Sequence, residues 1–347
     1  MIQELIYTSV PKGLAPDSQG FCTVAQTAGM TPLVSQTLKN LSGYRHTFPI
    51  GDERKPLNPE VFIHVIRRIA GADLHIVSRV ADCGVDYTQR SNLIAHHYTF
   101  EESDCIPCGP AAILSQPNLF RKNWNEKPRE ITSAPDIHNI QFPSNKCVTW
   151  EKQLGDAGWG GVVAERIEQG DPIIFIFDPK IKMLPLLVET FAILPPQLRW
   201  ETTFSTFFIK SQEPPNTNKI QIKCILNGSD EETFAKLTNN NFVLDLRQKQ
   251  NLSPTGKYVE FARTGFVAKA SIPPKIIIGN KTNEIKMPNT TPIIVPMQKR
   301  QIPIKNTRVY DSQQTNQLSV SFWIKLFIVT IIITLVITGL LALAKYS

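Results

Sequence analysis

The sequence lacks the features of a secreted protein. Its N-terminus, MIQELIYTSVPKG, has no basic stretch followed by an apolar run, so we expect no secretory signal. Cysteine is scarce, with six residues scattered between Cys22 and Cys224. Such spacing is typical of reduced cytosolic thiols and excludes the class of small domains held together by disulfides.

A nucleotide-binding loop is also missing. The segment GDAGWGG at 155–161 does not fit G-x-x-x-x-G-K-[ST], and TGKY at 255–258 lacks both the upstream glycine and the following Ser or Thr. We therefore do not expect this chain to hydrolyse nucleotides. We interpret the glycines at 155–161 as residues that allow close packing around Trp159.

A zinc or redox site is incomplete in this sequence. Cys105-Ile-Pro-Cys108 has the spacing of half a zinc site or of a redox motif, but the chain has no second such pair. A redox motif normally follows its strand directly, whereas residues 101–104 intervene here. We interpret the spacing as a coincidence and expect neither a metal nor another cofactor.

What the sequence does contain is a long apolar run near its C-terminal end. Residues 326–344 carry no charge over nineteen positions, and as a helix they span about 28 Å, close to the hydrocarbon thickness of a bilayer. Trp323 and Tyr346 lie at the two ends, where aromatic rings prefer the headgroups, and Lys325 and Lys345 can reach outward. We predict a transmembrane helix over 321–345.

The charge of the chain is concentrated beside this run. Residues 266–320 hold eight basic and two acidic side chains, which is most of the net charge of +7. The segment is also rich in Pro, Asn and Thr, so we predict an extended tether that lies against anionic lipid headgroups. Its few aromatic residues argue against nucleic acid as a partner. The basic flank predicts that the N-terminal body faces the cytoplasm.

Before the tether we predict two domains of an α+β (mixed α/β) fold. Residues 1–145 are rich in strand patterns and residues 146–265 alternate between strand and helix patterns. In the first domain we expect strands at 4–9, 21–26, 61–69, 74–80 and 93–100, helices at 32–41 and 110–115, and coil over 121–145. In the second we expect helices at 147–168 (interrupted at 155–161), 184–194 and 230–237, and strands at 173–177, 203–209, 220–226 and 242–246.

The densest group of polar residues falls between two predicted strands, in what we interpret as a loop. Carboxylates, guanidinium groups and imidazoles in one loop can serve acid–base chemistry, bind a ligand or partner, or simply hold the loop together, and the pattern leaves these three alternatives open. Adjacent histidines on a strand point to opposite faces, so at most one of them can serve a shared site. The candidate residues are Arg79, Asp82, Asp86, Tyr87, Arg90, Asn92, His96 and His97.

Several segments resemble a known family. ELIYTSVPKGL (4–14), GFCTVAQTAGM (20–30), LSGYRHTFP (41–49) and SRVADCGVDYTQRSNLIAHHYTF (78–100) are similar to the type 2 N-terminal domain of the GTPase-associated proteins of bacterial conflict systems. GDAGWGGVVAE (155–165), LPLLVETFAILPPQLRWETTFSTFF (184–208) and FVLDL (242–246) resemble the middle domain of the same family. The resemblance covers about 1–265. The Cys105–Cys108 spacing, the tether and the apolar run lie outside it.

The resemblance implies an adaptor without an established enzyme activity. We therefore expect a membrane-anchored, cytoplasm-facing protein that recruits a GTPase-containing complex or other conflict-system proteins. Two alternatives stay open, namely a hydrolytic or nucleotide-handling enzyme that uses the Asp82–His97 segment, and a sensor of a small ligand. Convergence of Asp82, Asp86, Arg90 and His96 on a deep pocket would favour these alternatives.

The predicted topology can be tested on intact cells. Because the basic residues precede the apolar run, protease added outside the cell should leave residues 1–320 uncut. An immunoblot against the N-terminal body, with lysed cells as the positive control for cleavage, measures this. Digestion of the body in unlysed cells would contradict the prediction.

Overall fold

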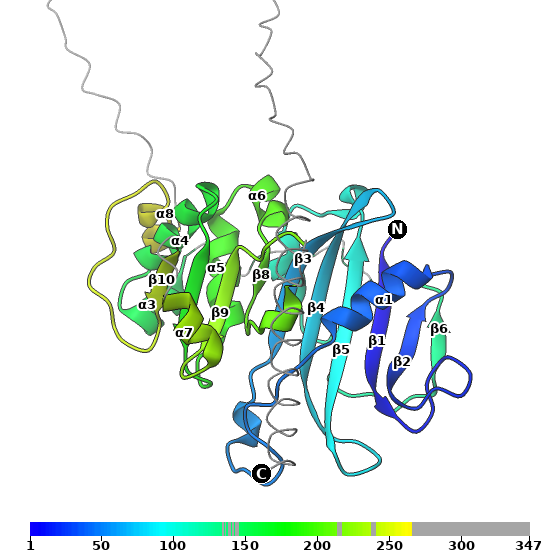
Figure 1. Cartoon of the computed structure of the whole chain (residues 1–347). Helices are drawn as coiled ribbons and strands as arrows, with labels where there is room; N and C mark the ends of the chain where they lie inside the picture. Colours follow the sequence, from blue (N-terminus) through cyan, green and yellow to red (C-terminus); the bar gives the residue numbers. More distant parts are fainter. Residues whose placement is uncertain are drawn as a thin grey trace, which may run out of the picture. The chain divides into compact units, whose positions relative to one another are not determined.

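The computed structural model describes residues 1–265, except for 134, 136, 138, 139, 141, 143–145, 214–216 and 237–240. Within these residues the strands form one sheet with the order β10-β7-β9-β8-β3-β4-β5-β1-β2-β6 (Figure 1). The strands are β1 (Gln3–Val10), β2 (Gly20–Thr27), β3 (Val61–Ile69), β4 (Ala72–Val85), β5 (Ser91–Phe100), β6 (Arg129–Ile131), β7 (Ile173–Phe177), β8 (Phe204–Ser205), β9 (Ile222–Leu226) and β10 (Phe242–Asp245).

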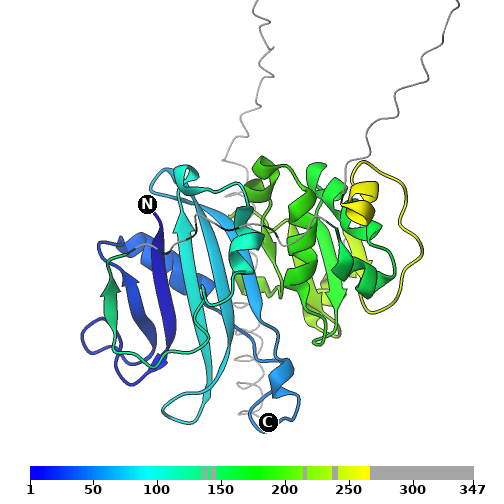
Figure 2. The same ribbon diagram turned by 180° about the vertical axis from the view of Figure 1, so that it is seen from behind.

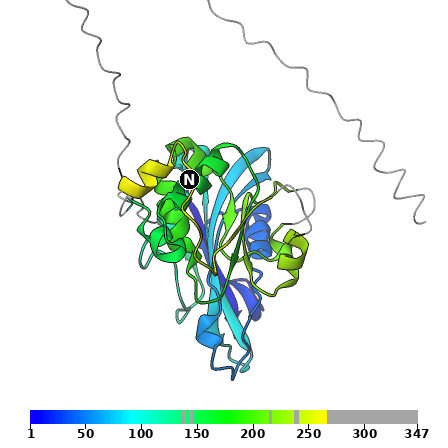
Figure 3. The same cartoon turned by 90° about the vertical axis from the view of Figure 1, so that its left-hand side faces the viewer.

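Helices cover both faces of this sheet. Figures 1 and 2 show α1 and α7 on one face and α2 with α3 to α5 on the other, and Figure 3 shows the sheet between the two layers. The helices are α1 (Pro32–Leu41), α2 (Gly109–Leu114), α3 (Val148–Leu154), α4 (Gly158–Glu168), α5 (Met183–Ile193), α6 (Pro196–Glu201), α7 (Asp230–Lys236) and α8 (Val259–Thr264). The connections also contain three 3₁₀ turns, η1 (Lys55–Leu57), η2 (Glu102–Asp104) and η3 (Lys210–Gln212).

Strands β1 to β5 pair in antiparallel fashion, and a tight turn sets the register of the longest hairpin. Ala70 and Gly71 connect β3 to β4 with φ angles of 49° and 88°. Two consecutive positive φ angles define the type I′ turn, whose twist matches that of the flanking strands. Ile69 therefore lies opposite Ala72, and the pairing continues without a shift to Val61 and Val80. The strands predicted at 61–69 and 74–80 are confirmed, and this turn joins them into one hairpin.

The other half of the sheet is parallel. Strand β7 has the sequence IIFIF and is buried at every position, with β10 on one side and β9 on the other. A strand covered on both faces needs apolar residues throughout instead of an alternating pattern. Helices α4 and α5 pack on one face of this half and α7 on the other (Figures 1 and 2).

The two halves meet at β8. This strand has two residues, Phe204 and Ser205, which pair in parallel with β9 and in antiparallel fashion with His64 and Ile63 of β3. The sheet is therefore continuous from residues of the predicted first domain to those of the second. The domain boundary near residue 145 stays a prediction.

Most predicted elements are confirmed, two interpretations are wrong and two helices were not predicted. The coil expected over 121–145 contains β6, which pairs with β2. The strand expected over 203–209 reduces to β8. The backbone N–H of Thr206 still donates to the carbonyl of Phe62, but the N–H of Phe62 donates to the Thr206 hydroxyl instead of its carbonyl, which ends the ladder. Helices α6 and α8 were not predicted. Pro195-Pro196 ends one helix and also begins α6, since proline is tolerated in the first turn, where no N–H is required.

The glycines of α4 pack against Trp150 and residues 258–259, which corrects the expected role of Trp159. A Cβ atom on Gly160 would lie 2.8 Å from the ring of Trp150, and one on Gly161 would lie 2.6 Å from the backbone of Tyr258 and Val259. Trp159 is instead half-buried and donates its indole N–H to the carbonyl of Asn251. Gly161 thus lets α4 approach the backbone at the start of α8, and Gly160 leaves room for the ring of Trp150 from α3.

No described helix has the length and apolar character that crossing a membrane requires. The predicted tether at 266–320 and the predicted transmembrane helix at 321–345, with Trp323, Lys325, Lys345 and Tyr346, lie outside the described residues.

The close approach of α4 to α8 predicts a large effect of a small substitution. Gly161→Ala places a methyl group against backbone atoms that cannot rotate away, and we expect a loss of about 1–3 kcal/mol of stability, as for other overpacked sites. Gly43→Ala is the matched control, because its Cβ would lie 3.6 Å from the Ser211 hydroxyl, an ordinary contact. Thermal and urea unfolding measure both variants. Equal stability of the two would contradict the packing described here.

Candidate docking site at the end of the β4–β5 hairpin

The structure places most candidate residues on strands instead of in a loop. Arg79 and Asp82 lie on β4, whereas Asn92, His96 and His97 lie on β5. The predicted loop shrinks because β4 is fourteen residues long and continues five residues past its predicted end. The turn itself holds Asp86, Tyr87 and Arg90.

The two histidines face opposite sides of the sheet, as predicted. His97 Nε2 lies 2.9 Å from the hydroxyl of Ser42, and its Nδ1 lies 2.7 Å from that of Ser78. On the other face, the backbone N–H of Arg121 donates to His96 Nδ1 at 2.9 Å. His96 Nε2 must then carry the proton and donate to Glu4 Oε1 at 2.8 Å.

Both imidazoles are buried and fully paired. Burial lowers the pKa of His97 to about 3 and lowers that of His96 despite the nearby Glu4 carboxylate. A neutral imidazole with both nitrogens bonded inside the fold has no free lone pair or proton for a substrate. The two histidines therefore hold α1 and the chain near residue 121 against β5.

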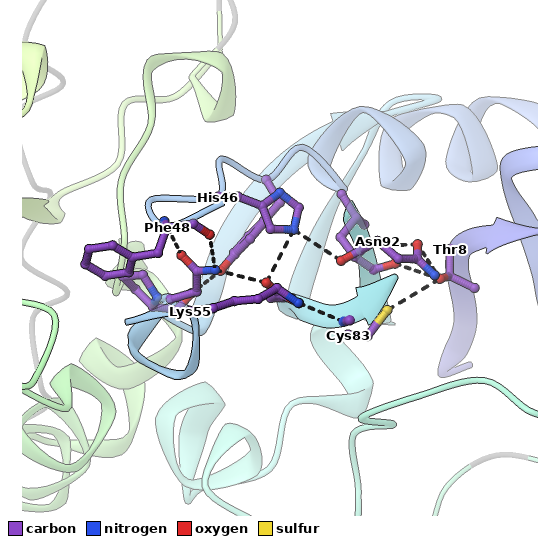
Figure 4. A network of polar contacts seen from close by, with 12 residues as sticks. Thr8, His46, Phe48, Lys55, Cys83 and Asn92 are labelled. Atoms are coloured by element: carbon purple, nitrogen blue, oxygen red, sulfur yellow. Dashed lines mark hydrogen bonds and ion pairs between the residues drawn. The ribbon is translucent and has the colours of Figure 1, made fainter. Parts of the chain in front are cut away.

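Asp82 is held by side chains from a distant part of the sequence, which no sequence pattern predicted as its partners. Its Oδ2 accepts from Asn58 Nδ2 at 2.9 Å and lies 3.6 Å from His46 Nε2. Its Oδ1 accepts from the backbone of Gly84 at 2.7 Å and lies 3.3 Å from Lys55 Nζ. Figure 4 shows this network, which joins the 42–60 segment to the hairpin.

Arg79 does not pair with Asp82, although the two are close in sequence. Residues three apart on a strand point to opposite faces. Arg79 instead forms an ion pair of 2.6 Å with Glu60 and donates to the carbonyl of Arg121 at 3.0 Å.

Asp86 builds the turn from inside. One carboxylate oxygen accepts from the backbone N–H groups of Thr88 and Arg90 and from the Thr88 hydroxyl, at 2.7–3.0 Å. The other accepts from Ser9 at 2.9 Å and from the Arg90 guanidinium at 3.1 Å. Burial alone would raise the pKa of Asp86, but these hydrogen bonds outweigh it and hold the pKa well below its usual range.

Asn92 ties the turn to β1. Its side-chain oxygen accepts from the Ser9 backbone at 3.1 Å and from Thr8 at 3.3 Å, and its amide donates to the Ser9 carbonyl. His46 also reaches the Asn92 carbonyl at 3.2 Å (Figure 4). Sequence reasoning missed Thr8, Ser9 and His46, because no local signal marks partners that lie about forty to eighty residues away.

Five residues at this end of the hairpin are exposed, Val85 and the four from Tyr87 to Arg90, and we call Val85, Tyr87 and Arg90 the hairpin tip. Val85 is 44% exposed and Tyr87 46% exposed, and the side chain of Arg90 is 65% exposed. The network beneath them fixes the backbone on which they stand. The arrangement therefore presents an apolar, an aromatic and a cationic side chain in a fixed geometry.

The cysteine motif lies elsewhere. All six cysteines are free. Burial raises the pKa of Cys105 to about 12 and that of Cys108 to about 11, so both thiols are protonated at neutral pH. In the part of the chain that the structure describes, no group of three or more His, Cys, Asp or Glu could hold a metal ion.

A crevice of about 240 Å³ lies between the start of β3 and the chain that leaves β7. Phe62, Phe177, Lys182 and Met183 are among its lining residues. None of the eight candidate residues lines it, so Asp82, Asp86, Arg90 and His96 do not converge on this crevice.

Two family models match the chain and support the resemblance seen in the sequence. The first, described as GTPase-associated protein 1, N-terminal domain type 2, matches residues 1–138, which include β1 to β6. The second, described as GTPase-associated protein 1, middle domain, matches residues 147–248, from α3 to β10. No curated protein and no solved structure gives a significant match.

The fold and these matches define a mixed α/β protein that carries two regions typical of GTPase-associated proteins. The chain belongs to the family of GTPase-associated proteins, with a type 2 N-terminal domain followed by the middle domain. Residues after 248 lie outside both matches.

The buried Asp86 predicts a specific acid dependence. Since its folded pKa lies below the value near 3.9 of an unfolded chain, its contribution to stability is present above about pH 4 and is lost as the pH falls further. Asp86→Asn should lower the melting temperature at pH 7 and flatten the decline of stability between about pH 4 and pH 2.

Asp17→Asn is the matched control for this measurement. Asp17 is exposed and has a φ angle of 55°, which Asn tolerates as well as Asp. Its acid profile should follow that of the wild type. An unchanged profile for Asp86→Asn would show that the turn does not depend on the charge.

Proposed function

We propose that this protein is a non-catalytic adaptor that recruits a GTPase-containing complex of a bacterial conflict or signalling system. The family suggests a GTPase as the partner, and we propose that this partner docks at the hairpin tip formed by Val85, Tyr87 and Arg90. Residues 321–345 anchor the adaptor in the membrane, and the body faces the cytoplasm, as the sequence predicts.

The observation that carries the proposal is the contrast between the buried and the exposed residues of the tip. Asp82, Asp86 and Asn92 form their hydrogen bonds inside the fold. Tyr87 is exposed, and Arg90 bonds to Asp86 but keeps 65% of its side chain exposed. Tyr and Arg are the residue types that most often dominate the energy of protein interfaces. A tip whose backbone is already fixed loses little conformational entropy when a partner binds.

The chemistry of the candidate residues also supports binding over turnover. Each histidine of the segment has both ring nitrogens engaged within the fold, and each carboxylate accepts several intramolecular bonds. General acid–base catalysis needs a group within reach of a substrate proton. These groups instead stabilise the surface on which a partner would dock.

Affinity capture of the full-length protein from detergent-solubilised native membranes tests the proposal. A GTPase should be recovered with the wild type, and Tyr87→Ala combined with Arg90→Ala should reduce its recovery about tenfold or more, as for central interface residues. Tyr87 is exposed, and Arg90→Ala removes one exposed ion-pair partner of Asp86, so the double variant should lose no more than about 1 kcal/mol of stability in thermal unfolding.

Leu252→Ala is the control, because Leu252 is 80% exposed and lies on the chain that follows β10. It should leave the recovery of the GTPase unchanged. Undiminished recovery with the tip variant would eliminate the tip as the docking site. Hydrolysis of a nucleotide by the purified protein, lost on replacing His96, would favour an enzyme.

A further inference from the structure

A second pair of histidines lies far along the sheet from the hairpin tip. His64 of β3 and His75 of β4 face each other with their ring planes 2° apart, and His64 Nε2 lies 3.2 Å from His75 Nδ1. Trp200 of α6 packs edge-on against both rings. Both imidazoles are buried, and neither belongs to the proposed docking site.

The partners of this pair decide where its protons lie. The carbonyl of Thr202 can only accept, so His64 Nδ1, at 2.8 Å, carries a proton and donates. A neutral His64 then has a bare Nε2 that accepts. His75 must therefore carry its proton on Nδ1 and donate it to His64.

The same reasoning leaves the far nitrogen of His75 without a proton. In the neutral ring His75 Nε2 holds a lone pair, and it lies 3.5 Å from Glu102 Oε2. A lone pair facing a carboxylate cannot form a hydrogen bond. The side chain of His75 is only 6% exposed, whereas that of Glu102 is 93% exposed, so one acceptor is buried and the other is hydrated.

Few other charges act on this site. Asp73 lies two residues away on β4 and forms an ion pair with Arg68 at 3.3 Å. Asp104 of the same 3₁₀ turn as Glu102 pairs with the N-terminal amine at 2.8 Å. Burial lowers the pKa of His75, and Glu102 and, more weakly, Asp73 oppose this shift. Burial and the neighbouring His75 lower the pKa of His64 to about 3, so His64 stays neutral.

We propose that His75 and Glu102 bind a single proton between them, and that this proton fastens the Glu102–Asp104 turn to the β3–β4 hairpin. When it binds, His75 Nε2 becomes a donor to Glu102 while Nδ1 keeps its bond to His64. The 3₁₀ turn is followed by Cys105 and then α2, so protonation of His75 tightens the connection between β5 and α2. This proton-dependent contact does not rest on the proposed adaptor role.

The sign of the pH effect follows from the direction of the shift. The pKa of His75 is lower in the folded protein than the value near 6.5 of an unfolded chain, so the unfolded chain takes up the proton first. Stability conferred by a neutral His75 is therefore present above about pH 6.5 and decreases as the pH falls toward the folded pKa. Glu102 reduces this loss, because it favours the charged ring.

Ring nitrogen NMR of the full-length protein in detergent micelles, with labelled histidine, tests the proposal. At pH 7.5 His75 should be protonated on Nδ1 and bare on Nε2, and acid should add the proton to Nε2. Glu102→Gln should lower the proton affinity of His75 by about twofold to fivefold, the range expected for an exposed partner.

Asp73→Asn is the control that removes a nearby carboxylate without touching His75 Nε2, and it should change the proton affinity less than Glu102→Gln. Hydrogen exchange of residues 101–108 should slow when His75 is protonated in the wild type but not in Glu102→Gln. A proton on Nε2 at pH 7.5, or equal affinities in the wild type and Glu102→Gln, would overturn the proposal.

Discussion

The pairing of a two-residue strand holds the two halves of this protein in one sheet. Phe204 and Ser205 of β8 bond to β3 on one side and to β9 on the other. Phe204 is completely buried and packs against Phe191 of α5 and the ring of His64. An antiparallel and a parallel set of strands can belong to one continuous sheet only if a strand with both kinds of neighbour lies between them.

Buried polar groups are the second constraint on the structure. His64, His96 and His97 are fully buried, and each has partners for both ring nitrogens. A buried polar group without a partner costs free energy, so these bonds specify which segments approach the sheet. Elements distant in sequence are therefore held by histidine: α1 through His97, the 121 region through His96 and α6 through His64.

The elements with strong local signals could be predicted from the sequence. The helix at Pro32–Leu41 begins after Thr31, whose hydroxyl accepts from the backbone of Val34, and its bounds match the prediction. The continuous apolar run at Ile173–Phe177 is likewise a buried strand. The strand expected at 203–209 is only two residues long, because the residue pattern does not indicate how far a backbone will hydrogen-bond to neighbouring strands. Helices α6 and α8, of six residues each, are too short for a periodic pattern.

The sequence by itself determined the mixed α/β class, the family resemblance and the segment that carries the candidate site. It also showed that adjacent histidines on one strand cannot serve one site, because side chains on a strand alternate. Only the tertiary structure decided which candidates are exposed. Asp86 and Arg90 lie four residues apart, yet the first is buried beneath the turn and the second extends from it. The difference arises because Ser9, which donates a hydrogen bond to Asp86, belongs to another strand, β1. The sequence pattern does not show which distant segment will lie beside a turn.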